Sequence, residues 1–554
     1  MKPRPDCGVK QYDDHGTIVR LVTPAVATAG TAQASPRIIA PAPPAAPPKP
    51  TADERVDVVE TGWRQALVVL GVMLAALLQT LDSTIVNVAL PTVQGNLGAS
   101  IDEGAWVVTA YIIAAVIVIP VTPWLQSRFG RKQYFLVSIA GFTIASLACG
   151  LASTIQELIV FRVVQGLFGG GLLATSQAIL RDTFPARQFG LSQAIYTFGA
   201  VVGPSAGPTI GGILTDNYSW RWVFDVNIVP GIVAILLLAP LLRNPTKPRA
   251  SGFDGMGLVL LAIGLGSLQY VLDEGERNDW FSDPAILLCS VAAVLGIAAF
   301  VVWELKGAKR PIVDLSVLFR RNIAIGCLAA MLNASMIFGV LLVFPQYLTG
   351  VLGFTATQDG YLLAIRALPI FLLTIPIGLY VNSGKIDPRY LLVGGLATGG
   401  AGLIGLAFVT TSHTEFGTMV PWLILSGTGI AFVFTPLLVA VLRSVAPSDS
   451  PKAGAFISLA LNLGGSLTSA SLVTFLDRRE TFHGSVLGDA AVRSNPQVAT
   501  LLAQPHGLAT LAALVQREAA TMSYADTFFA LGALAILFAG LGLAIKPPPK
   551  RSPG

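Results

Sequence analysis

Four polar residues interrupt the first long apolar stretch of the chain. Gln79, Asp82, Ser83 and Asn87 stand three or four residues apart, so they lie on the same side of a helix. A charged side chain at the centre of an apolar span costs about 2.5–3.5 kcal/mol, and such residues usually face a bundle interior or a water-filled cavity. We predict that Gln79 and Asn87 line such a cavity and that Asp82 carries a proton. A structural aspartate satisfied by neighbouring hydroxyls is the alternative.

A basic residue in the fourth apolar stretch stands at the same depth as Asp82. Arg162 follows five residues after Glu157, where this stretch begins, and Asp82 stands about as far from the end of the first stretch. At about 1.5 Å per residue, both lie roughly 8 Å below one boundary. A proton-exchanging carboxylate needs burial and a nearby cation acting in opposite directions. We predict an Asp82–Arg162 proton-coupling pair with Gln165 in the cavity; a static pair that locks the helices is the alternative.

Two further charges stand inside apolar stretches. Arg366 lies about seven residues into the tenth stretch, and Asp225 lies near the start of the sixth. We predict that Arg366 reaches the cavity as a counter-ion or as a ligand for a charged group. Either side chain can instead reach the membrane interface, which is the interpretation we favour for Asp225. The four histidines stand outside the apolar stretches and the four cysteines are scattered, so no metal site is predicted.

The composition indicates an integral membrane protein. Of the 554 residues, 53% are hydrophobic and only 12% are charged, about half the charged fraction of soluble domains. Fourteen stretches are long enough to cross a hydrocarbon core, which takes about 20 residues, and only helices can do so in separate spans. They cover 64–88, 104–124, 134–153, 157–180, 190–214, 222–242, 254–273, 284–304, 323–347, 359–381, 389–411, 418–442, 453–476 and 524–545. No basic patch with interleaved aromatic residues suggests nucleic-acid binding.

The charges of the loops set the orientation. Six alternate loops hold 17 lysines and arginines, whereas the intervening short loops hold only Arg221 and Arg277. Basic loops stay in the cytoplasm. We therefore predict a multi-pass membrane protein with both termini cytoplasmic.

An internal sequence repeat, which we call the echo, divides the chain into two halves. Pro120 to Val137 aligns without gaps on Pro376 to Val393, 256 residues and eight helices later. Two parallel halves with a site between them are typical of two-bundle secondary transporters. The predicted parts are a disordered Pro/Ala-rich cytoplasmic tail (1–62), a six-helix bundle (63–243), an inserted helix pair with its linker (244–321), a second six-helix bundle (322–546) containing a long outer loop (477–523), and a short cytoplasmic tail (547–554).

Two further motifs belong to the first bundle. The fifth stretch carries a strip of glycines and prolines that permits close helix contact and bending: Gly199, Gly203, Pro204, Gly207, Pro208, Gly211 and Gly212. The loop after the second stretch holds Arg128, Gly130 and Arg131, which we interpret as a gating latch between the bundles or as orientation signals alone. A G-x-S-x-G match around Ser205 lacks the strand and histidine of a hydrolase, and no Walker A sequence occurs.

The segments Leu81–Pro91 and Arg162–Gly166 and the glycine strip resemble those of the major facilitator superfamily, in particular the fourteen-helix EmrB/QacA-type drug:proton antiporters. The segment Gly266–Gln269 with Leu272, Asp273 and Asp279–Phe281 is similar to the EmrB branch. The chain departs from the superfamily pattern at Pro123 and Ser127, where relatives carry glycine and aspartate, and at Asn462, where many carry arginine. The roles of those residues do not transfer.

The resemblance implies a membrane protein that is not an enzyme and carries no cofactor. It implies proton-driven multidrug efflux of small amphipathic compounds by a pump embedded in membrane lipids, which works with a periplasmic adaptor protein and an outer-membrane channel. The same fold would also serve an exporter or proton symporter of one metabolite. A non-transporting membrane scaffold and a hydrolase that uses Ser205 are the alternatives from other classes.

Overall fold

The computed structural model describes residues 11–12, 18–19, 60–244, 252–308, 311–446, 449–491, 496–504 and 506–546. It divides into two units, Met1–Thr51 and Ala52–Gly554. In the first unit, β1 (Gln11–Tyr12) pairs antiparallel with β2 (Ile18–Val19). The rest of the predicted disordered tail up to residue 59, and the tail at 547–554, lie outside the described residues.

The second unit is helical, and each of the fourteen predicted stretches coincides with one helix or with two consecutive helices. The elements are α1 (Gly62–Leu97), α2 (Ile101–Phe129), α3 (Arg131–Leu151), α4 (Ile155–Gly169), α5 (Leu172–Thr183), η2 (Ala186–Gln188), α6 (Phe189–Asn217), α7 (Trp222–Asp225), α8 (Ile228–Leu241), α9 (Gly255–Glu274), η3 (Trp280–Ser282), α10 (Pro284–Val302), η4 (Trp303–Gly307), α11 (Leu315–Leu318), α12 (Arg321–Gly350), α13 (Ala356–Asn382), α14 (Pro388–Val409), α15 (Phe416–Leu442), α16 (Ser450–Ala490), α17 (Pro496–Leu502), α18 (Gly507–Leu537) and α19 (Leu541–Ala544).

Thirteen helical stretches among the described residues are long and apolar enough to cross a membrane. The remaining predicted span is α6, a helix of 29 residues that packs along α1. Large apolar side chains stand exposed on the outside of these helices, for example Leu236 at 68%, Leu288 at 69% and Phe408 at 78%. Such an apolar outer surface fits hydrocarbon and not water.

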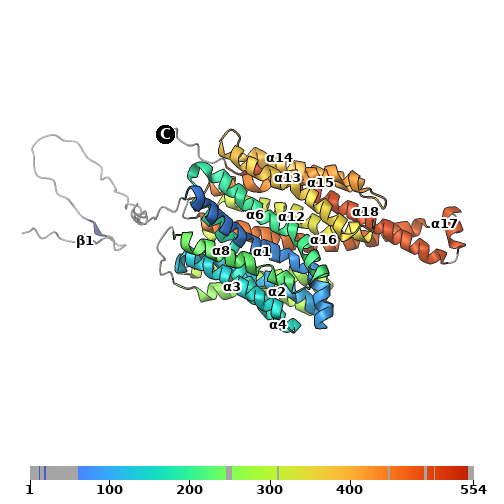
Figure 1. Ribbon diagram of the computed structural model, residues 1–554, viewed down its shortest axis with the longest axis horizontal. Helices are drawn as coiled ribbons and strands as arrows, with labels where there is room; N and C mark the ends of the chain where they lie inside the picture. The colour runs from blue at the N-terminus through green and yellow to red at the C-terminus, as the bar shows by residue number, and fades with distance from the viewer. Residues whose placement is uncertain are drawn as a thin grey trace, which may run out of the picture. The chain divides into compact units, whose positions relative to one another are not determined.

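The helices form two groups, α1–α8 and α12–α19, which Figure 1 draws in blue to green and in yellow to red, respectively. Helices α1–α8 pack mainly on one another, and so do α12–α19, while α9 packs on α10. The echo extends to the helix ends, because α2 and α13 both begin with a capping box, made by Ser100 with Glu103 and by Thr355 with Gln358.

The two groups touch along α6 and α13 and where α16 meets α2 and α5. Near the start of α6 its backbone meets that of α13 directly, because a Cβ on Gly190 would lie 2.2 Å from the carbonyl oxygen of Gly378. Thr435 of α15 also donates a hydrogen bond to Thr197 of α6 at 3.0 Å. These contacts bring the two groups together along the first half of α6.

The linker after the inserted pair is fastened to α16. Lys452 bonds Asp314 at 2.7 Å. Partial burial acts to raise the pKa of Asp314, but its hydrogen bonds from Lys452 and Ser316 are decisive and hold the pKa below its usual value. The ion pair therefore stabilises the position of the linker against the second group.

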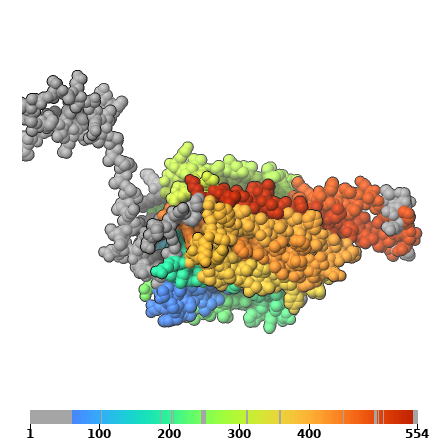
Figure 2. All heavy atoms as spheres, turned by 90° about the horizontal axis from the view of Figure 1, so that it is seen from above, coloured from blue at the N-terminus to red at the C-terminus, as the bar shows by residue number. Residues whose placement is uncertain are grey.

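The predicted outer loop at 477–523 is more helical than the one short helix, near 507–522, that its sequence suggests. Helix α16 continues to Ala490, and α18 already begins at Gly507. The 41 residues of α16 span about 60 Å at ~1.5 Å each, about twice the thickness of a hydrocarbon core. Figures 1 and 2 show α16 and α18 running together beyond the other helices, with α17 at their tip. We call residues 477–523 the outer hairpin.

Candidate functional site

The centre of the site is a buried ion pair between α1 and α4. Arg162 Nη1 lies 2.5 Å from Asp82 Oδ2, and neither residue is exposed. Gln165 donates to Asp82 Oδ1 at 3.0 Å and accepts from Arg162 at 2.8 Å. Asp82 and Arg162, which the sequence placed at one depth, therefore contact each other, and Gln165 closes a triangle of hydrogen bonds with them.

Helix α2 holds the guanidinium of Arg162 in place. Arg162 Nε donates to the carbonyl oxygen of Val107 at 2.9 Å. The guanidinium carbon lies 4.1 Å from the centre of the Tyr111 ring and 5.8 Å from that of Phe224, so aromatic faces cover it. Removing one partner of such a buried pair leaves an uncompensated charge, at a cost of about 3–5 kcal/mol.

Asn227, at the start of α8, is a member of the site that the sequence reasoning missed. Its Nδ2 donates to Asp82 Oδ1 and to Ser146 Oγ, each at 3.1 Å, and its buried Oδ1 has no partner in the part of the chain that the structure describes. An amide inside the apolar run 222–242 was the available signal. The nearby Asp225, whose charge made it the more obvious candidate, lies partly exposed beside Gly150.

These contacts define what the Asp82 carboxylate can do. It accepts hydrogen bonds from Arg162, Gln165 and Asn227, so its charged form is fully satisfied. A proton on Asp82 would remove the charge that balances Arg162 and would weaken all three bonds. Loss of the charge on Asp82 would therefore alter the contacts of α1 with α4 and α8.

The other two cavity residues predicted on α1 point in different directions. Gln79 is buried, and its Oε1 accepts from the backbone N–H of Leu173 at 2.9 Å. That N–H belongs to the first turn of α5, where the glycines at 169–171 separate α5 from α4. Asn87 is exposed. The predicted polar face thus divides between the ion pair, a helix start and the surface.

Arg366 is a second buried cation, located on α13. Only 6% of it is exposed; Nε donates to Ser426 Oγ at 3.1 Å and Nη2 to the carbonyl oxygen of Met336 at 2.5 Å. Within the described part of the chain, no carboxylate lies at ion-pair distance from it. An intramembrane cation without an acidic partner is a candidate ligand for an anionic group.

The glycine strip of α6 lies against α1. A Cβ added at Gly203 or Gly207 would lie 2.1 Å from the hydroxyl of Thr80 or Thr84, respectively. At Gly211 the nearest atom is the backbone oxygen of Ile85, at 2.8 Å, and at Gly199 it is Met73 Cε, at 2.6 Å. Gly212 is off the contact, because only Val88 approaches it, at 3.9 Å. Pro204 and Pro208 lie inside the helix.

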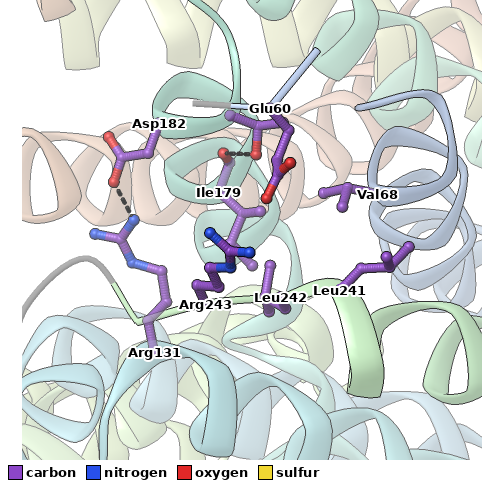
Figure 3. A pocket seen from close by; sticks show the side chains of 9 residues that line it. Glu60, Val68, Arg131, Ile179, Asp182, Leu241, Leu242 and Arg243 are labelled. Atoms are coloured by element: carbon purple, nitrogen blue, oxygen red, sulfur yellow. Dashed lines mark hydrogen bonds and ion pairs between the residues drawn. The ribbon is translucent and has the colours of Figure 1, made fainter. Parts of the chain in front are cut away.

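The loop with Arg128, Gly130 and Arg131 forms an ion pair within the first group of helices. Arg128 is exposed, and Gly130 has a φ of 85°, a conformation that favours glycine. Arg131 forms an ion pair with Asp182 at the end of α5, as Figure 3 shows. Both partners belong to the first group, so this ion pair does not join the two groups. A gating role of the loop stays a prediction.

A small pocket lies around this ion pair, away from Asp82. Its lining combines two acids and two arginines with apolar side chains: Glu60, Val68, Arg131, Ile179, Asp182, Thr183, Leu241, Leu242 and Arg243. The N–H of Glu60 donates to the carbonyl oxygen of Thr183 at 3.1 Å. These contacts join the start of α1 to the ends of α5 and α8.

Two groups of membrane helices with a buried carboxylate–arginine pair define a secondary transporter. The Major Facilitator Superfamily model matches residues 72–469. The chain belongs to this superfamily and, within it, to the EmrB-type multidrug transporters.

The relatives agree with this assignment. The chain is 34% identical over 497 residues to the multidrug export protein EmrB of Escherichia coli (strain K12), which covers 88% of this chain and 96% of that protein. It is 34% identical over 430 residues to the fatty acid resistance protein FarB of Neisseria gonorrhoeae, covering 76% and 83%. The names of these relatives refer to multidrug export and to fatty acid resistance.

Solved structures show the same fold. The proton:xylose symporter XylE matches with a TM-score of 0.54 at 15% identity, over 86% of this chain and 94% of that one. The human organic anion transporter MFSD10 matches with a TM-score of 0.54 at 13% identity, over 86% and 100%.

Proposed function

We propose that this multidrug transporter is a proton-driven antiporter that exports hydrophobic and amphipathic compounds across the bacterial inner membrane by alternating access. The observation that carries the proposal is the fully buried Asp82–Arg162 pair with its ring of amide donors. Asp82 takes up the proton, and Arg162 responds to the change of charge. The proton gradient supplies the energy and no cofactor takes part.

The same proposal includes the substrate path and the orientation. Gln79, Asn87, Gln165 and Arg366 contact substrate when the two groups of helices part, and Arg366, which has no acidic partner, favours anionic amphipathic compounds. Both termini lie in the cytoplasm, because the basic loops lie on that side. The names of the relatives EmrB and FarB, which refer to multidrug export and fatty acid resistance, support a broad hydrophobic substrate range.

Transport by the purified protein in proteoliposomes tests the direction of coupling. With an acidic lumen, we expect ethidium and the anionic dye 1-anilinonaphthalene-8-sulfonate to accumulate inside, because protons leave as substrate enters. Lumenal pH should rise on dye addition, and a protonophore should abolish accumulation. Dye accumulation that requires an acidic exterior instead would identify a symporter and overturn the proposal.

The outer hairpin is proposed as the docking site for a periplasmic adaptor protein, which in turn contacts an outer-membrane channel. Arg479 and His483 of α16 bond Asp526 of α18 at 2.6 and 2.8 Å, which stabilises the base of the hairpin. Beyond the base, Val486 and Leu508 stand 50% and 72% exposed. An exposed apolar surface on a rigid element fits a protein partner.

Removing the tip of the outer hairpin should separate docking from transport. The side chain of Ala519 lies 3.9 Å from the position of a Cβ on Gly484, so a short Gly/Ser turn can replace residues 488–515. We expect dye exchange in proteoliposomes to stay within about twofold, since the ion pairs at the base remain. Co-purification with an adaptor produced in the same cells should be lost, whereas Asp489→Asn in the intact hairpin should retain it. Unchanged co-purification after the deletion would remove the docking proposal.

A further inference from the structure

A second membrane carboxylate lies where the inserted helix pair meets both groups of helices. Asp273 is at the outer end of α9, within a span long and apolar enough to cross the membrane. Its neighbour Glu274 accepts a hydrogen bond from Thr109 of α2 at 3.1 Å. Gln269 donates to Ser466 of α16 at 2.6 Å. We call this junction of α2, α9 and α16 the seam.

Two buried oxygen atoms in the seam lack a hydrogen-bond donor. Gln269 is fully buried, and its Nε2 donates to Asp273 Oδ1 at 2.8 Å. Gln269 Oε1 and Asp273 Oδ2 are both shielded from solvent, and neither has a partner among the described residues. Buried acceptors are seldom left unsatisfied. Since both atoms belong to one hydrogen-bonded pair, a single proton on Asp273 Oδ2, donated to Gln269 Oε1, would satisfy both.

The geometry points to Asp273 as a second proton-binding site. Binding one proton converts the carboxylate into a carboxylic acid, which pairs with the Gln269 amide through two hydrogen bonds. This pairing fixes the Gln269 side chain, and its bond to Ser466 then fastens α9 to α16. Proton release removes one of the two bonds and loosens the seam. The inference rests on the proposed proton-driven transport.

Helix α2 connects this site to Asp82. Arg162 of the first site contacts Val107 and Tyr111 of α2, whereas Thr109 and Trp106 face α9, Trp106 by stacking on Tyr270 with ring centres 5.3 Å apart. Val107 and Thr109 are about 3 Å apart along the helix axis and lie on nearly opposite sides of it. The two acids therefore act on opposite faces of one helix at the same depth.

The surroundings of Asp273 contain few other charges. On α9 and the turn after it, Glu274 pairs with Arg277 at 3.2 Å, and Glu276 bonds Trp280 and Thr474 of α16. The elements packed against α9 approach with hydroxyls from Thr109 on α2 and Ser466 on α16, and α10 contributes the thiol of Cys289 near Tyr270. Glu274, the next residue along α9, is the acid adjacent to Asp273 in the chain.

Infrared difference spectroscopy during a pH titration of the purified full chain tests the inference, with the proton itself as the probe. The C=O stretching band of a protonated carboxylic acid should titrate in the wild type and lose one component in Asp273→Asn. Asp273→Glu should restore a titrating component, and Asn96→Gln, at an exposed position without a carboxyl group, should leave the spectrum unchanged. Gln269→Met should shift the frequency of the Asp273 component, because the acid then lacks its amide partner.

The outcomes separate this inference from the antiport proposal. Identical spectra of the wild type and Asp273→Asn would overturn the second proton site, whatever dye exchange shows. A frequency unchanged in Gln269→Met would overturn the acid–amide pair. If Asp273→Asn loses its band while wild-type dye exchange moves no protons, the seam binds a proton but the antiport proposal fails.

Discussion

Replacing Asp82 by asparagine should reduce proton-driven dye accumulation to background, on the order of 100-fold or more, because an intramembrane acid that carries the coupled ion cannot be replaced by an amide. Asparagine keeps the volume of the side chain and can still accept from Gln165 and Asn227, which both contact Asp82. It has no proton to exchange. The measurement is ethidium accumulation in proteoliposomes with an acidic lumen, together with lumenal pH.

The stability of the variant must be measured beside its transport. Asp82→Asn leaves Arg162 buried without a counter-charge, which costs about 3–5 kcal/mol of folding free energy. The double variant Asp82→Asn/Arg162→Gln removes both charges, so we expect it to recover most of the lost Tm without recovering coupling. Asp216→Asn, at an exposed position near the end of α6, is the matched control and should behave as the wild type. Normal proton exchange by Asp82→Asn would show that Asp82 does not carry the proton.

The ion pair could be predicted from the sequence because membrane depth is nearly a one-dimensional property. Loop charges give the direction of each span, and counting residues from its end gives the depth. Asp82 and Arg162 stand at one depth and contact each other. Asn227 could not be identified in this way, because several polar residues stand at similar depths and only tertiary packing decides that α8 brings this one to Asp82.

Hydropathy also has a limit along each helix. It predicts the apolar part of α16, but it carries no signal for the polar continuation of the same helix. The sequence therefore predicts a loop with one short helix where α16 and α18 form the outer hairpin. The division of the fourth stretch into α4 and α5 could have been predicted, because three consecutive glycines occupy 169–171 and glycine disfavours a continuous helix. Length alone suggested one helix. The seam could not be predicted, because the sequence does not indicate which helices an inserted pair contacts.

The glycine strip gives the second large effect. A methyl group at Gly203 would meet Thr80 Oγ1 at 2.1 Å and the backbone carbon of Thr80 at 2.6 Å, so α6 and α1 must separate. Overpacking of this kind costs about 1–3 kcal/mol. We expect Gly203→Ala to lower the Tm and to reduce ethidium exchange by about tenfold, because the misplaced helices carry the proton site. Gly212→Ala on the same helix, with its nearest neighbour at 3.9 Å, should leave both unchanged.

A rescue experiment distinguishes steric contact from a general need for flexible glycines. At Gly207 the obstructing atom is the Thr84 hydroxyl at 2.1 Å, and the next atom, Thr84 Cβ, is 3.0 Å away. Thr84→Ala should therefore restore exchange to Gly207→Ala. Thr80→Ala should not restore it to Gly203→Ala, since the backbone carbon of Thr80 remains in place. Equal rescue at both positions, or none at either, would contradict a strip whose role is to let α6 lie directly on α1. Rescue at Gly207 alone would show that transport requires close packing of α6 on α1 beside Asp82. It would also show that the glycines of the strip are not needed for their own sake.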